Sequence, residues 1–95
     1  MAMEVISEEM LVLRLNRIIG QVHGIQKMME NHRDCEDIIT QLAAVRSAID
    51  GVGALMIKDC MKILTNNEPI AKCADIESLS RAIAIWSKLR VGDSS

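Results

Sequence analysis

Residues 34–60 read DCEDIITQLAAVRSAIDGVGALMIKDC, and this stretch decides the fold. Its apolar residues recur at steps of three and four, which is the spacing of one face of a helix. Asp34 is a suitable cap, and Thr65, Asn66, Asn67 and Pro69 end the pattern. The sequence therefore predicts one long helix over residues 35–65, with a face formed by Ile38, Leu42, Val45, Ile49, Val52 and Met56.

Two further helices flank this one. Ser7, followed by Glu8 and Glu9, starts a helix over residues 7–30. Asp75 caps a third helix over residues 75–90. The apolar residues of these two helices again follow helical spacing: Leu11, Leu15, Ile18, Val22, Ile25 and Met29 in the first, and Ile76, Leu79, Ile83 and Trp86 in the last. Nothing alternates with period two, so we expect one all-α domain over residues 1–95, with a loose arm at residues 1–6 and a frayed tail.

The composition favours association of two copies. Hydrophobic residues make up 49% of the 95-residue chain, yet it has one Trp and no Tyr or Phe, which suits helices packed on helices. Three helices of this kind cannot enclose so wide an apolar surface, whereas an antiparallel four-helix bundle made from two chains can. Small residues gather in the middle of the second helix, so we expect the two copies to cross near Ser47 and Ala48.

The two cysteines of the long helix cannot meet within one chain. Cys35 and Cys60 would lie about 37 Å apart along a continuous helix. In an antiparallel dimer, Cys35 would face Cys60 of the partner subunit, which gives two identical two-thiol sites. Thiolate pairs suit soft cations such as Cu(I) or Zn(II), sulfur exchange or capture of an electrophile. The alternative is that both cysteines are small buried hydrophobic residues.

The remaining candidates carry weaker signals. Cys73, in the connector before the third helix, is interpreted as an accessory thiol, and His32 as a solvated loop histidine. Arg14 and Arg17 lie away from the apolar stripe, and Arg46 projects from the second helix. The net charge of −2 gives no global field for nucleic acid, but a symmetric oligomer would repeat this local basic surface.

Several classes of protein are disfavoured. Three cysteines without a signal-peptide pattern argue against a disulfide framework and for a reducing, cytoplasmic setting. No apolar run approaches the roughly 18 residues of a membrane span, so no membrane partner is expected. Phosphate-binding loops, metalloprotease motifs and nucleophile–base pairs are missing from the sequence, so we expect no enzyme and no obligatory cofactor.

Residues 14–30, RLNRIIGQVHGIQKMME, and 34–50, DCEDIITQLAAVRSAID, closely resemble one family, the CsoR/RcnR/FrmR/CstR repressors. Its members sense copper, nickel or cobalt, formaldehyde, or persulfides. The resemblance runs without a gap from about Leu11 to Lys62. It implies a three-helix protomer, an antiparallel four-helix-bundle homodimer, and a homotetramer made of two dimers. It also implies that the inducer-free protein binds operator DNA, with Arg14, Arg17 and Arg46 at DNA-facing positions.

The sensing positions depart from each known pattern. The copper sensors place Cys at position 35, His at position 60 and Cys one turn later, where this chain has Cys35, Cys60 and Leu64. The nickel sensors place His at that last position, and the persulfide sensors place their second Cys there. The formaldehyde sensors carry Pro after the initiator, and this chain has Ala2. The resemblance therefore identifies the family and leaves the inducer open.

We expect a transcriptional repressor that is released from its operator when an inducer engages Cys35 and Cys60 of the partner subunit. Two thiols without an imidazole suit Cu(I), or a reactive sulfur species or oxidant that links the cysteines. The alternative is a thiol-based metal-binding or carrier protein with no role on DNA. An enzyme that uses Cys35 as a nucleophile is a third and weaker interpretation.

Overall fold

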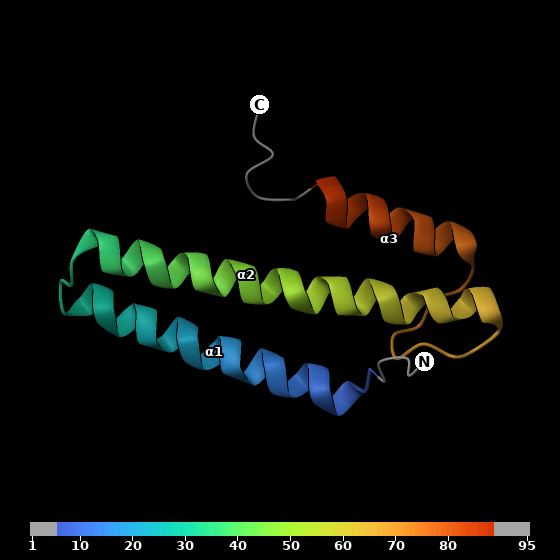
Figure 1. Cartoon of the computed structure of the whole chain (residues 1–95), viewed down its shortest axis with the longest axis horizontal. Coiled ribbons are helices and arrows are strands. Elements are labelled where there is room, and N and C mark those ends of the chain that lie inside the picture. Colours follow the sequence, from blue (N-terminus) through green and yellow to red (C-terminus); the bar gives the residue numbers. More distant parts are fainter. Residues whose placement is uncertain (1–5, 89–95) are drawn as a thin grey trace, which may run out of the picture. The chain divides into compact units, whose positions relative to one another are not determined.

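The computed structural model describes residues 6–88, and within this range it is all-helical, without strands. The elements are α1 (Glu8–Glu30), α2 (Cys35–Cys60), the 3-10 helix η1 (Met61–Thr65) and α3 (Ile76–Lys88) (Figure 1). The predicted helices are present, but the last turn of the second one, from Met61, is a 3-10 helix. The predicted arm at residues 1–5, the end of the third helix at residues 89–90 and the tail lie outside the described residues.

The chain divides into two compact units, Met1–Val52 and Gly53–Ser95. The first contains α1 and the first two-thirds of α2. The second contains the end of α2, η1, the connector and α3.

Local capping explains where α1 begins. The hydroxyl oxygen of Ser7 accepts a hydrogen bond from the backbone N–H of Met10 at 3.1 Å, as predicted for a cap. Ile6 and Leu11, both buried, occupy the two positions that pair in a hydrophobic staple. Ile6 is therefore part of the folded unit, and the predicted loose arm was wrong at this residue.

The turn between α1 and α2 is closed by a Schellman motif. The backbone N–H of Arg33 donates to the carbonyl of Met28 at 2.9 Å, and that of His32 donates to Met29 at 3.1 Å. His32 adopts a left-handed conformation with φ of 54°, the position that glycine usually occupies. The turn reverses the chain, so α2 starts at Cys35 and returns along α1 within the first unit.

The core of the first unit is a row of residues spaced by seven. The buried members are Leu11, Ile18 and Ile25 in α1 and Val45 and Val52 in α2. A seven-residue repeat is the spacing of helices that pack side by side as in a coiled coil. The predicted apolar stripes are thus only half correct, because their alternate members, four positions later, remain exposed: Leu15, Val22, Met29, Leu42 and Ile49.

In the second unit, α3 contacts η1 and presents Leu79 to the interior. Gly53 of α2 lies under the ring of Trp86, and a Cβ built on Gly53 would overlap that ring. Gly53 is one of the small residues that gather in the middle of the second helix. Its lack of a side chain is explained by the packing of α3 of the same chain.

The segment Cys35–Thr65 is long and apolar enough to cross a membrane, judged by length and composition only. The expectation that no segment would meet this test was wrong. Between Ile38 and Ile57 the only charged residues are Arg46 and Asp50. This helix is apolar and is little buried within one chain, so it exposes an apolar surface of the kind that usually binds a partner.

Candidate functional site

Cys35 is the first residue of α2, and its side chain is exposed. Three acidic residues surround it in sequence: Asp34, Glu36 and Asp37. The Asp37 carboxylate pairs with Arg33, with Nη2 and Oδ2 3.5 Å apart, on the exposed surface. The Cys35 thiol is therefore accessible to a ligand or to a second chain.

Cys60 is the last residue of α2 and is half-buried. Burial raises the pKa of the Cys60 thiol above its ordinary value, and the neighbouring Cys73 thiol and the Asp59 carboxylate raise it further. These surroundings disfavour the thiolate form of Cys60.

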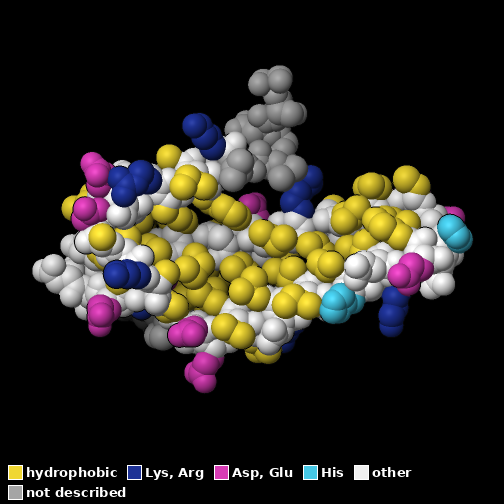
Figure 2. Space-filling view, turned by 180° about the vertical axis from the view of Figure 1, so that it is seen from behind, with side chains coloured by type: hydrophobic (Ala, Val, Ile, Leu, Met, Phe, Trp, Pro, Cys, Tyr) yellow, Lys and Arg dark blue, Asp and Glu magenta, His cyan; other side chains and the backbone are white. Residues whose placement is uncertain are grey.

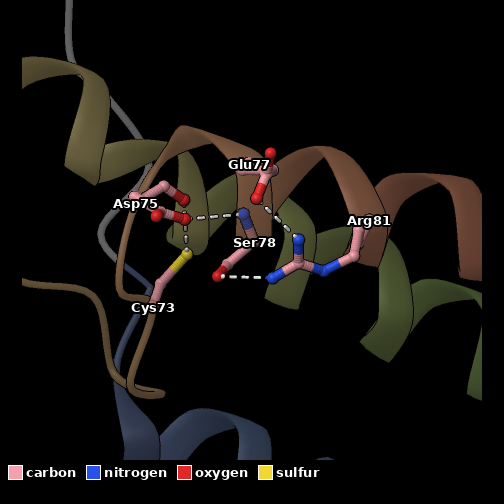
Figure 3. A network of polar contacts seen from close by, with 5 residues as sticks. All are labelled: Cys73, Asp75, Glu77, Ser78 and Arg81. Carbon is pink, nitrogen blue, oxygen red and sulfur yellow. Dashed lines mark hydrogen bonds and ion pairs between the residues drawn. The ribbon is translucent and has the colours of Figure 1, made fainter.

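Cys73 lies beside Cys60, and its thiol is one of the groups that raise the pKa of the Cys60 thiol. The Cys73 thiol also donates to the backbone carbonyl of Asp75, with Sγ and O 3.8 Å apart (Figure 3). Sequence reasoning treated Cys73 as accessory because a connector has no periodicity that would reveal its neighbours. The one available signal was the Asp75 cap, which fixes where the connector must end.

Asp59 holds the connector against the end of α2. Its side chain is fully buried, and Oδ2 accepts a hydrogen bond from the backbone N–H of Ile70 at 2.6 Å. Its Oδ1 lies 2.8 Å from Nζ of Lys62. The charge of Lys62 is therefore paired with Asp59.

Within residues 6–88, the side chains of His, Cys, Asp and Glu form no group of three that could hold a metal ion. Cys35 and Cys60 stand at opposite ends of one helix, so the predicted pairing of these thiols requires a second chain. Leu64, one turn after Cys60, is exposed on η1 and offers no donor atom. The donors that remain are thiols, which suit soft cations.

An exposed apolar face covers one side of the first unit. We use this name for Leu15, Val22, Met29, Leu42 and Ile49. Leu15, Val22, Met29 and Ile49 each follow a buried core residue by four positions, and Leu42 follows the half-buried Ile38 by four. In two antiparallel helices that face each other, these positions fall on the same side. Figure 2 shows hydrophobic side chains gathered along the hairpin of α1 and α2. A contiguous group of exposed apolar side chains is typical of an interaction surface.

The three predicted DNA-facing residues are all exposed. Arg14 follows the core residue Leu11 by three positions, and Arg17 directly precedes the core residue Ile18. Both therefore lie on the side of α1 that faces away from the exposed apolar face. Arg46 follows the core residue Val45 directly and borders the apolar face on α2. One chain therefore does not present the three arginines on one surface.

Comparison with known proteins gives the class. Residues 7–85 match the model of the metal-sensitive transcriptional repressor family. The chain is 50% identical over 46 residues to the copper-sensing transcriptional repressor CsoR of Bacillus subtilis, covering 48% of this chain and 46% of that protein. It is 41% identical over 46 residues to the copper-sensing transcriptional repressor RicR of Mycobacterium tuberculosis, covering 48% of each.

A longer and more distant match is the transcriptional repressor RcnR of Citrobacter koseri. It is 25% identical over 83 residues, covering 85% of this chain and 92% of that protein. The matched segment spans about half the length of the two copper-sensing relatives.

Because the family model covers most of its length, the chain belongs to the family of metal-sensitive transcriptional repressors. This confirms the family that the resemblance indicated. The relatives are regulatory proteins rather than enzymes, as the sequence predicted.

Proposed function

We propose that this protein is an operator-binding transcriptional repressor that is released from DNA by Cu(I). Its membership of the repressor family and the copper-sensing relatives support this proposal. The observation that carries it is the placement of thiols at both ends of α2, one exposed and one half-buried. Thiolates are the donors that Cu(I) prefers, and no obligatory cofactor is needed.

The exposed apolar face supports association of two copies. Its five residues would lose their contact with water in an antiparallel four-helix bundle, which is a strong reason for the chain to dimerise. The same arrangement would place Cys35 near Cys60 of the partner subunit. Two such dimers would form the homotetramer that the family resemblance implies.

Dimerisation would also bring together basic residues that one chain holds apart. Arg14 and Arg17 lie on the opposite side of the hairpin from Arg46, so a broad basic surface requires residues from more than one copy. Phosphate contacts by such a surface release counterions and make binding salt-dependent. A protein of this function acts in the cytoplasm, on DNA.

The proposed release is an effect of metal binding on helix packing. Cu(I) held between Cys35 and Cys60 of the partner subunit would connect the two chains at both ends of the α2 pair. A connected pair would cross at a different angle and move the arginines of α1 out of register with the phosphates. Linkage requires that Cu(I) bind the released state more tightly than the DNA-bound state.

Fluorescence anisotropy with a labelled fragment of the protein's own promoter tests DNA binding. We expect affinity that falls steeply with salt, and a smaller slope for Arg14→Ala and Arg17→Ala, by roughly 0.9 for each phosphate that the variant no longer neutralises. Arg81→Ala is the matched control, because Arg81 is exposed on α3 and pairs with Glu77 at 3.1 Å. Absence of salt-dependent binding would favour the carrier alternative.

Mass spectrometry of the reduced protein distinguishes the inducers. Under anaerobic conditions, Cu(I) bound without covalent change, together with loss of DNA binding, supports the proposal. A covalent dimer through Cys35 and Cys60 after polysulfide treatment, without a response to Cu(I), would assign the protein to sulfur sensing. Because α2 contains no histidine, its thiols have no imidazole beside them in this helix, and the response to polysulfide is also worth testing.

A further inference from the structure

We propose that Cys60 and Cys73 of one chain form a two-thiolate site for a soft monovalent metal ion, Cu(I). The pair lies entirely within the second unit, at the junction of α2 and the connector. It needs no residue of a second chain. Its role in induction depends on the proposed function, whereas its capacity to bind Cu(I) does not.

The fold brings the two cysteines together although they are thirteen positions apart in the sequence. The carboxylate of Asp59, which immediately precedes Cys60, accepts the backbone N–H of Ile70 at 2.6 Å. This bond brings the connector back to the end of α2 three residues before Cys73. The thiol of Cys73 then lies beside that of Cys60.

A second restraint fixes Cys73 from the other side. Its thiol contacts the carbonyl of Asp75, and the carboxylate of Asp75 accepts the backbone N–H of Ser78 at 2.8 Å in the first turn of α3 (Figure 3). The position of Cys73 is thus tied to both α2 and α3. A site whose donors are held before the metal arrives loses less entropy in ordering them on binding.

The donor set selects the metal. Two thiolates suit Cu(I), which accepts low coordination by soft ligands, whereas structural Zn(II) takes four ligands. No third His, Cys, Asp or Glu side chain joins the pair to make a three-ligand group among residues 6–88. As the two Cu–S bonds form, each thiol releases its proton, and the copper stays in the +1 state throughout.

The half-buried positions of both thiols are compatible with entry of the ion. If the dimer forms as proposed, the exposed Cys35 of the partner subunit would be a third thiolate for the same Cu(I). Cys73 would then supply the donor that Leu64 cannot.

The test is competition for Cu(I) against a chromophoric chelator, under anaerobic conditions, with the full-length reduced protein. The variants are Cys35→Ser, Cys60→Ser and Cys73→Ser. Ala71→Ser is the matched control, because Ala71 is a small half-buried residue of the same connector. Circular dichroism checks that each variant keeps its helices, and X-ray absorption counts the sulfur atoms on the copper.

We expect Cys60→Ser and Cys73→Ser each to weaken Cu(I) binding at least tenfold, while Ala71→Ser binds like the wild type. Cys35→Ser should keep one Cu(I) per chain with two sulfur ligands. A Cys73→Ser variant that binds as tightly as the wild type would overturn the proposal, as would complete loss of binding in Cys35→Ser. None of these results depends on operator binding, so they are separate from the test of the proposed function.

Discussion

Asp59, with 1% of its surface exposed, accepts the backbone N–H of Ile70 through Oδ2 at 2.6 Å. This single bond joins the end of α2 to a connector that otherwise has no regular structure. The pairing of its other oxygen with Lys62 at 2.8 Å compensates part of the cost of burying a carboxylate. This contact brings the connector that carries Cys73 back to the end of α2.

Removing the Asp59 carboxylate should loosen the connector. Asp59→Ala leaves the Ile70 N–H and the Lys62 ammonium without their partner, so we expect a loss of about 1–3 kcal/mol in the free energy of unfolding. Urea denaturation followed by circular dichroism measures it. Glu68→Ala, an exposed acidic residue of the same connector, is the control and should change stability by less than about 0.5 kcal/mol. Equal effects of the two changes would show that the Asp59 contact is unimportant.

Gly53 should tolerate no side chain, because Trp86 occupies the space of a Cβ. We expect Gly53→Ala to destabilise the second unit by about 1–3 kcal/mol through overpacking, although alanine favours a helix. Gly20→Ala in α1, where nothing lies within 4 Å, should instead stabilise by about 1 kcal/mol. Trp86 is the only tryptophan, so its fluorescence reports the first change directly. An unaltered emission spectrum and stability in Gly53→Ala would contradict this packing of Trp86 on α2.

The cap of α3 should weaken in acid. The hydrogen bond from the backbone N–H of Ser78 holds the pKa of the Asp75 carboxyl below its ordinary value of 3.8. Because the folded state lowers this pKa, the ionised cap stabilises α3 fully when the pH is above the ordinary pKa of the carboxyl. This stabilisation is lost as the pH falls through the lowered pKa of the folded state. We expect the stability of wild type relative to Asp75→Asn to fall below about pH 4, since the amide oxygen can accept the bond but does not titrate. Acid titrations followed by circular dichroism measure the difference, and identical curves for the two proteins would exclude this role.

The exposed apolar face should control assembly. Ile49→Glu places a charge on the face and should convert the proposed oligomer to a monomer that no longer binds operator DNA. Leu13→Glu is the control, because Leu13 is equally apolar and exposed but does not belong to the face. Sedimentation equilibrium measures the mass of each variant. If Ile49→Glu keeps the wild-type mass, the face is not the interface.

The sequence predicted the parts of the fold that local chemistry controls. Ser7 and Asp75 are caps as expected, and the steps of three and four located each helix. Which half of each stripe is buried could not be predicted, because Ile18 and Val22 look alike until a second helix selects one of them. The sequence predicted a loop at His32, but it did not predict the left-handed conformation of this residue, which glycine usually adopts.

The candidate site was predicted only in part, because helical spacing locates residues within one helix but does not reveal contacts between distant segments. Helical spacing places Cys35 and Cys60 at the two ends of α2, and the structure has them there. The neighbourhood of Cys60 depends on a bond between Asp59 and Ile70, eleven positions apart, that no periodic pattern reveals. The pairing of Cys35 with Cys60 of the partner subunit, and the contacts of Arg14, Arg17 and Arg46 with DNA, stay predictions.

The most direct test of the proposed function is the response of the operator complex to Cu(I), measured by anisotropy with wild type and Cys35→Ala. We expect the two proteins to bind the operator with similar affinity, because Cys35 is not among the basic residues. We expect Cu(I) to release the wild type, whereas Cys35→Ala stays bound because Cu(I) cannot connect its two chains. Release of Cys35→Ala at the same Cu(I) concentration as the wild type would contradict the proposed mechanism.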